Sequence, residues 1–282
     1  MKEKLALGTV QFGLDYGIVN HSGQVKFEEV KKILRYAKKS NIDTLDTASS
    51  YGDSERILGK IGVEDCQIVT KTTPLKNNID DVIDNFYKSL ENLNTSQVNG
   101  LLIHDINDID NKNFGQLFNK LKLLQDQGLI GKIGFSTYSP MQIDFLLNNF
   151  EFDLIQLPFN VFDTRLSKGG QLKALKDKGI EIHSRSIFLQ GLLLNFENLP
   201  DYFSTWKRQF NDYQSIVNES ELSLLEYAVN FVLNTQEIDK VLVGVINKCQ
   251  LKEIVQAVKN KNGVKPYPID DIKLINPNFW AI

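Results

Sequence analysis

Short apolar runs alternate along this chain with longer segments in which apolar residues recur at helical spacing. LALGT at 5–9 is the first run. FEEVKKILRYAKKS at 27–40 follows it, with Val30, Ile33 and Ala37 on one face. Continuous apolar runs are typical of strands that are buried on both faces, and a period of about 3.6 residues is typical of an amphipathic helix. The pattern therefore predicts strands that each lead into a helix.

The same alternation continues almost to the end of the chain. Further strands are predicted at 42–46, 67–71, 98–104, 132–136, 153–157, 180–184 and 240–244. Further helices are predicted at 54–61, 79–93, 114–127, 140–148, 166–178, 221–234 and 249–259. The stretch 190–218, rich in Asn, Asp and aromatic residues, and the tail from 267 show no clear period.

Eight such strand–helix units without a linker favour a closed parallel barrel over an open sheet. The predicted fold class is α/β, a (β/α)8 TIM barrel, and we expect one domain over residues 1–282. A chain of 282 residues is of ordinary size for such a barrel. The glycine-rich dinucleotide fingerprint is absent, so a bound nucleotide would be held in another way.

Composition and charge narrow the class of partner. A net charge of −3 gives no basic excess, so we expect neither a nucleic acid nor an anionic membrane as a partner. Cys66 and Cys249 lie far apart and are expected to be reduced thiols. The apolar run near the N-terminus is too short for a signal peptide, and no apolar run is long enough to span a bilayer. These features predict a soluble cytoplasmic protein.

Polar residues occupy the predicted strand ends, and in such barrels the active site lies at the carboxyl ends of the strands. Each has an ordinary structural alternative: Asp46 as a turn former, Tyr51 as a packed rim residue, Lys71 as a solvated lysine, and His104 as a core histidine. The four together favour a single pocket, because they follow adjacent strands. Burying Lys71 is costly unless it is paired, and Asp46 is its nearest predicted partner.

This set of residues suits the reduction of a carbonyl group. A tyrosine has an ordinary pKa near 10, and a nearby ammonium group lowers it. We expect Asp46 to hold Lys71, Lys71 to lower the pKa of Tyr51, and His104 to orient the carbonyl or the phenol. Tyr51 would then donate the proton, and the hydride would come from a nicotinamide cofactor.

At these residues the chain resembles the aldo-keto reductase superfamily. Asp46, Tyr51, Lys71 and His104 match that family's catalytic tetrad in order and in local wording: LDTASSYGDSE, IVTKT and LLIHD. GTVQFG, GKIGFST and IQLPFN match further segments, and RSIFLQGLL and VLVGVINKCQLKEI match the cofactor-binding segments more loosely. The resemblance covers nearly the whole chain, and it implies a barrel that binds NADPH in extended form, with no metal.

The resemblance also implies cofactor-binding positions. Ser136 and Gln156 would meet the nicotinamide carboxamide, and Arg185 occupies the slot in which the family usually has a tyrosine stacked on the ring. The backbone around Ile187 to Gly191 would hold the pyrophosphate, and Ser186 is a further cofactor-binding candidate. Near the last strand, the adenosine and its 2′-phosphate would contact Asn247, Lys248, Gln250 and Glu253. Ile254 replaces the usual asparagine, and Lys248 as the main cation favours NADPH over NADH.

The substrate is expected to be a small carbonyl compound. Candidate contacts are Phe12, Tyr16, Asp105 and the segments 195–218 and 265–282, which mix aromatic and polar residues as carbohydrate sites do. The opening GTVQFGLDYGIVNHSGQV is similar to bacterial members associated with surface-sugar biosynthesis. It therefore favours a sugar or sugar-nucleotide carbonyl.

Two other functions stay open from the residues. A cofactor-binding regulatory subunit with little turnover would keep the same tetrad. A metal-dependent barrel hydrolase would need clustered ligands, but the chain has 3 histidines and no His-x-His pattern, so no metal site is expected. The oligomeric state is left open.

Overall fold

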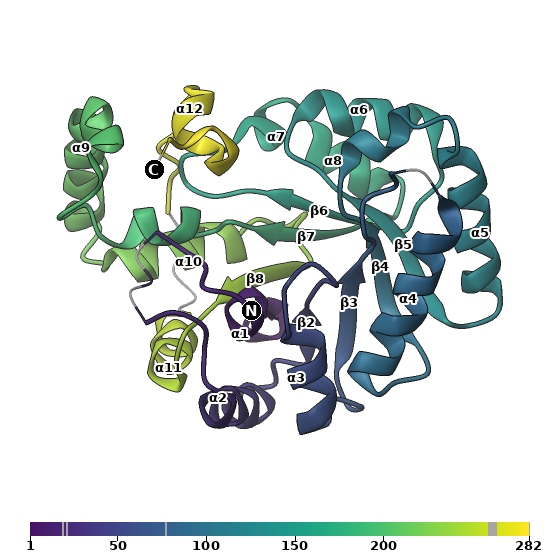
Figure 1. Ribbon diagram of the computed structural model, residues 1–282. Helices are drawn as coiled ribbons and strands as arrows, with labels where there is room; N and C mark the ends of the chain where they lie inside the picture. Colours follow the sequence, from purple (N-terminus) through teal and green to yellow (C-terminus); the bar gives the residue numbers. More distant parts are fainter. Residues whose placement is uncertain (19, 21, 77, 259–263, 282) are drawn as a thin grey trace.

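In the described part of the chain, eight parallel strands close into a barrel in sequence order, with β8 paired to β1. The computed structural model describes residues 1–282 except 19, 21, 77, 259–263 and 282 (Figure 1). The strands are β1 (Leu5–Gly8), β2 (Thr44–Asp46), β3 (Gln67–Lys71), β4 (Val98–Ile103), β5 (Ile130–Ser136), β6 (Leu154–Pro158), β7 (Glu181–Arg185) and β8 (Lys240–Gly244). The predicted (β/α)8 barrel is confirmed.

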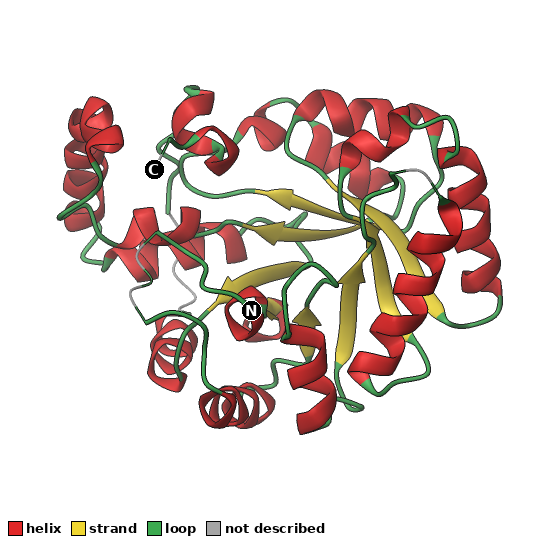
Figure 2. Ribbon diagram, in the orientation of Figure 1, coloured by secondary structure: helices red, strands yellow, loops and turns green. Residues whose placement is uncertain are grey.

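Helices surround this barrel, and Figure 2 shows them as an outer layer around the strands. They are α1 (Val10–Gly13), α2 (Phe27–Lys39), α3 (Ser54–Ile61), α4 (Ile79–Leu93), α5 (Phe114–Asp126), α6 (Pro140–Asn149), α7 (Arg165–Lys168), α8 (Gln171–Asp177), α9 (Lys207–Glu219), α10 (Leu224–Leu233), α11 (Lys248–Ala257) and α12 (Ile272–Ile275). Among these described helices, none is both long and apolar enough to cross a membrane.

Two predictions about helices were wrong. The helix expected at 166–178 is divided into α7 and α8 by Gly169 and Gly170, because Gly170 adopts a left-handed φ of 83°. The stretch 190–218 is not irregular throughout, since it contains α9, whose Phe210 and Tyr213 pack on other aromatic rings. The predicted end of the last helix, Lys259, lies outside the described residues.

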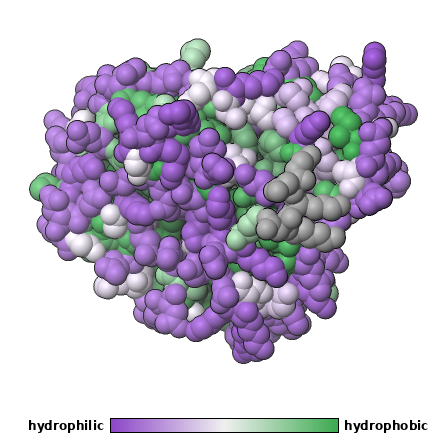
Figure 3. Space-filling view, turned by 180° about the vertical axis from the view of Figure 1, so that it is seen from behind, coloured by the Kyte–Doolittle hydropathy of each residue, from purple (hydrophilic) through white to green (hydrophobic). Residues whose placement is uncertain are grey.

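Polar side chains lie at the carboxyl ends of the strands, beyond a small apolar cluster. Val69, Leu102 and Leu154 form a small buried cluster of their own. Asp46 and Lys71 end β2 and β3. In Figure 1 the arrowheads of β6, β7 and β8 point toward the side on which α10 and α12 lie, so the polar strand ends face these elements. On the face seen in Figure 3, hydrophilic side chains predominate and hydrophobic ones show in separate areas.

Gly13 at the end of α1 packs directly on the turn that carries Tyr51. A Cβ atom on Gly13 would overlap the Tyr51 carbonyl oxygen and crowd the Ser54 nitrogen. Gly52 in the same turn has a φ of 55°, and a Cβ there would overlap the Gly13 carbonyl oxygen. This close approach of two backbones fixes the position of Tyr51 relative to β1.

Gly13→Ala is therefore expected to destabilise the protein. Overpacking typically costs about 1–3 kcal/mol, which lowers the melting temperature of a chain of this size by about 2–10 °C. Thermal unfolding followed by circular dichroism measures this change. Gly115→Ala is a matched control, because a Cβ on Gly115 in α5 meets nothing within 4 Å. Equal melting temperatures for the two variants would contradict the assigned contact.

Candidate active site

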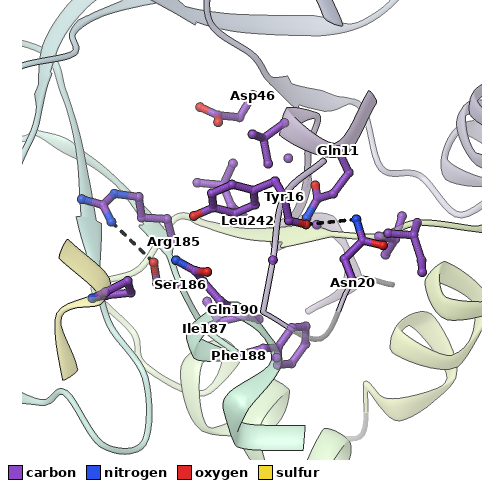
Figure 4. A pocket seen from close by; sticks show the side chains of 18 of the residues that line it. Gln11, Tyr16, Asn20, Asp46, Arg185, Ser186, Ile187, Phe188, Gln190 and Leu242 are labelled. Carbon is purple, nitrogen blue, oxygen red and sulfur yellow. Dashed lines mark hydrogen bonds between the residues drawn. The ribbon is translucent and has the colours of Figure 1, made fainter. Parts of the chain in front are cut away.

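A cavity of about 570 Å³ opens at the carboxyl ends of the strands. Figure 4 shows part of its lining, with Tyr16 near the centre, Asp46 above it and Arg185 to its left. Most of the residues predicted for the site line it: Asp46, Tyr51, His104, Ser136, Gln156, Arg185, Ser186, Gly191, Gln250 and Glu253. Lys71 is fully buried and contacts Asp46 directly.

Asp46 and Lys71 form a buried ion pair. The Lys71 ammonium donates to both carboxylate oxygens of Asp46, at 2.8 and 2.7 Å, and to the carbonyl oxygen of Thr47 at 2.8 Å. The Gln156 amide also donates to Asp46 Oδ1, at 2.6 Å. Burial acts to lower the pKa of Lys71, but Asp46 and Tyr51 outweigh it and raise the pKa. Lys71 is therefore a fixed cation.

Tyr51 lies over this cation. The Lys71 nitrogen is 4.8 Å from the centroid of the Tyr51 ring, and the ring meets His104 edge-on with centroids 6.1 Å apart. The net shift of the phenol differs from the expectation: burial raises the pKa of Tyr51, and the lowering by Lys71 is the smaller effect. Burial is the largest cause, and the charge of Asp46, which offsets that of Lys71, adds to it by also raising the pKa. Tyr51 stays protonated at neutral pH and is able to donate its proton.

His104 follows β4 and stands beside Tyr51 in the cavity. Its Nδ1 lies 3.4 Å from the hydroxyl of Ser50. Burial, and next the charge of Lys71, lower the pKa of His104 from 6.5 to about 4. The imidazole is therefore neutral at physiological pH, and His104 lines the cavity, where it can hydrogen-bond a ligand oxygen.

A pH titration of His104 is expected to show its transition near pH 4 instead of near 6.5. The unfolded chain takes up this proton near pH 6.5 and the folded chain near 4. Between pH 6.5 and 4 the unfolded chain binds this proton and the folded chain does not. The free energy of unfolding is therefore at its full value above pH 6.5 and decreases as the pH falls toward 4. NMR of the His104 ring, assigned with His104→Asn, measures the transition. A midpoint near 6.5 would contradict the buried environment.

The chain after β7 adopts an unusual backbone. Ser186, Leu189 and Gln190 have φ values of 56°, 48° and 54°, although none is glycine, and Gly191 has a φ of 96°. Such conformations are costly and concentrate at ligand-binding sites. The Asn160 amide holds the turn by donating to the Ser186 carbonyl oxygen at 3.0 Å. The result is a fixed loop whose Ser186 to Phe188, Gln190 and Gly191 line the cavity.

Arg185 ends β7 and reaches across to the loop after β5. Its guanidinium donates to the Thr137 carbonyl oxygen at 2.9 Å and to the Ser186 hydroxyl at 3.4 Å. The group also stacks on Tyr138, 4.0 Å from the ring centroid. These contacts hold a positive charge at the wall of the cavity.

The residues predicted at the start of α11 divide into two groups. Gln250 and Glu253 line the cavity, together with Ile254. Asn247 and Lys248 do not. The Asn247 side chain accepts from the Gln250 backbone nitrogen at 2.9 Å and so caps the helix. The Lys248 ammonium lies 6.0 Å from the centroid of the Tyr36 ring, on α2.

Some of the predicted substrate contacts line the cavity and others do not. Tyr16 lines the cavity, but Phe12 is buried elsewhere and Asp105 caps a short 3-10 helix, Ile106–Asp110. Pro277 and Asn278 of the tail line it, whereas the described lining contains no residue of 195–218. Sequence reasoning missed Gln11, Asn20 and Tyr138. Tyr138 had a signal, because it directly follows the strand-end pair Ser136 and Thr137.

The cavity fits an elongated polar cofactor better than a metal. It runs from the tetrad to α11, and its volume is in the usual range for ligand sites. Gln11 lines it with a buried Oε1 atom that has no hydrogen-bond partner among the described residues, as expected for an acceptor that a ligand satisfies. Among the described residues no group of His, Cys, Asp or Glu is arranged to hold a metal ion.

Comparisons with known proteins agree with this fold. A model of the Aldo/keto reductase family matches residues 4–275. An aldo-keto reductase from Bacillus halodurans, solved in its holo form, has a TM-score of 0.73 and 19% identity, over 92% of this chain and 87% of that one. A glycerol dehydrogenase from Gluconobacter oxydans has a TM-score of 0.71 and 20% identity, over 91% and 86%. At these identities the two structures show the fold alone. No curated protein sequence matched.

Proposed function

Because this chain belongs to the aldo/keto reductase family, whose members reduce carbonyl compounds with NAD(P)H, we propose that NADPH is its cofactor and that Tyr51 is its proton donor. The observation that supports this proposal most is the joint placement of Tyr51, His104 and the Asp46–Lys71 pair at one cavity. In this group a phenol, a fixed cation and a neutral imidazole lie together.

In the proposed reaction, each of the four side chains Asp46, Tyr51, Lys71 and His104 has one role. Reduced nicotinamide, when bound, supplies a hydride to the carbonyl carbon. Tyr51 gives its proton to the carbonyl oxygen, so an alcohol forms, and the phenolate regains a proton from solvent. The neutral imidazole of His104 hydrogen-bonds the same oxygen and orients it. Lys71 stabilises the transient phenolate, and Asp46 keeps Lys71 in place.

We assign the cofactor contacts along the cavity. Ser136 and Gln156 would bind the nicotinamide end, the loop from Ser186 to Gly191 would bind the pyrophosphate, and Gln250 and Glu253 would bind the adenosine end. Lys248 is the cation nearest in sequence to that end and is the basis for preferring NADPH over NADH. Its ammonium would have to leave Tyr36 to reach a 2′-phosphate.

The proposed substrate is a hydroxylated, sugar-related carbonyl compound, as in the bacterial surface-sugar type. Tyr16 and Tyr138 provide flat apolar surfaces at the cavity, and the amides of Asn20 and Asn278 lie at the same cavity. Rings beside amide groups suit a ligand with one apolar face and several hydroxyl groups.

A direct test combines binding and turnover. Titration with NADPH and with NADH, followed by protein fluorescence, measures both affinities. Oxidation of the bound cofactor is then followed at 340 nm with 4-nitrobenzaldehyde and with a panel of aldoses. Oxidation with an aldose supports the full proposal. Tight binding without any oxidation would favour the regulatory subunit instead, and failure to bind either cofactor would refute both.

A further inference from the structure

Arg185 carries a positive charge that the described structure leaves without an acidic partner. Its recorded hydrogen bonds go to neutral oxygens, those of Thr137 and Ser186. It takes part in none of the ion pairs between described residues. The acidic residues that line the same cavity are Asp46, which is committed to Lys71, and Glu253 on α11.

Arg185 differs from Lys71 in how far neighbouring groups neutralise its charge. Lys71 is buried and donates to both oxygens of a carboxylate, so the pair is close to neutral when seen from the cavity. Arg185 is half-buried and stacked on the neutral ring of Tyr138, which fixes the guanidinium without offsetting its charge. Its field therefore reaches into the cavity with little compensation.

This field acts at the reacting end of the cavity. Arg185 lines the same cavity as Tyr51 and His104. Burial raises the pKa values of Tyr51 and Tyr16 and lowers that of His104, while the charge of Arg185 acts to lower all three. A carbonyl compound bound by Tyr51 and His104, and the ring that delivers hydride to it, must both lie within reach of this charge.

Reduction of a carbonyl compound changes the charge at that place. The dihydronicotinamide ring is neutral, and loss of hydride leaves it with a charge of about +1, while the carbonyl compound becomes a neutral alcohol. A fixed cation nearby repels the oxidised ring and leaves the reduced ring almost unaffected. We propose that Arg185 makes this site discriminate between the two redox forms of its cofactor, binding the reduced form more tightly and weakening retention of the oxidised product.

This inference rests on the proposed function, and its test is a ratio of binding constants that needs no turnover. Fluorescence titration of the full chain gives Kd for NADP+ and for NADPH at low salt. Both forms carry the same phosphates, so contributions from phosphate-binding residues cancel in the ratio. With Arg185→Met, Kd(NADP+)/Kd(NADPH) is expected to fall on the order of tenfold. With Arg185→Lys, which keeps the charge, the ratio should stay near that of the wild type.

Lys248→Met supplies a second control. This cation does not line the described cavity, and its proposed partner, the 2′-phosphate, is common to both forms, so its loss should change both affinities by the same factor. A ratio that is unchanged in Arg185→Met would overturn the inference. That outcome would mean that Arg185 pairs with a group common to both forms, such as the pyrophosphate. If the wild type bound neither form, the proposed function itself would fail, which is a separate result.

Discussion

Replacing Tyr51 with phenylalanine is expected to lower the rate of hydride transfer by about 10²–10⁴-fold, the usual effect of removing a general acid. The substitution deletes the phenolic hydroxyl and keeps the ring. The contacts of that ring with His104 and with the Lys71 ammonium therefore remain. Cofactor affinity and melting temperature should stay near those of the wild type. Stopped-flow absorbance of premixed NADPH and enzyme, on addition of 4-nitrobenzaldehyde, measures the step.

Tyr213→Phe is the matched control for this experiment. It removes a hydroxyl from a fully buried tyrosine that does not line the cavity and whose oxygen has no hydrogen-bond partner among the described atoms. Its hydride-transfer rate should equal that of the wild type. If Tyr51→Phe also reacted at the wild-type rate, another group would have to be the acid.

Lys71→Met is expected to have the second large effect, on both turnover and stability. It removes the cation that stabilises the phenolate, so hydride transfer should fall at least about 10²-fold. It also leaves the buried carboxylate of Asp46 with a single amide donor from Gln156. An uncompensated buried charge costs about 3–5 kcal/mol. Single-turnover kinetics and urea unfolding measure the two effects separately.

The double variant Asp46→Asn with Lys71→Met separates the catalytic role from the structural one. It removes both charges, so most of the lost stability should return. Hydride transfer should remain slow, because the cation beside Tyr51 is still absent. Recovery of activity together with stability would show that Lys71 acts as a structural residue alone.

The alternation of apolar runs and amphipathic segments was enough to predict the barrel, because each strand of a closed parallel sheet must be buried on both faces. The alternation did not predict elements whose structure depends on tertiary contacts. The sequence of α9 is polar overall, and its helix is stabilised by packing of Phe210 and Tyr213 against rings from distant segments. The break at Gly170 depends on a single backbone angle that the periodicity does not encode.

The site was predictable to the extent that strand ends determine it. Asp46, Tyr51 and His104 meet at one cavity because the carboxyl ends of adjacent strands share one edge, and Lys71 pairs with Asp46 beside it. Position along the chain did not reveal that Asn247 caps α11 or that Lys248 turns toward Tyr36. Side-chain direction at a helix start depends on the neighbouring elements, and the sequence does not specify them locally.

The direction in which the pKa of the Tyr51 phenol shifts was also not predictable from the sequence. The neighbouring cation was foreseen, but the extent of burial and the opposing charge of Asp46 were not weighed against it. Both depend on the tertiary structure around Tyr51, such as the close approach of Gly13 to the turn at Gly52.

The central claim is that this cavity transfers a hydride from NADPH to a carbonyl carbon, with Tyr51 as the acid. The most direct measurement uses NADPH deuterated at the transferable C4 position in a single turnover with 4-nitrobenzaldehyde. Mass spectrometry then analyses the alcohol. The account predicts one deuterium at the carbinol carbon for each cofactor oxidised, and loss of this product in Tyr51→Phe. An alcohol without deuterium, or an equal yield from Tyr51→Phe, would contradict it.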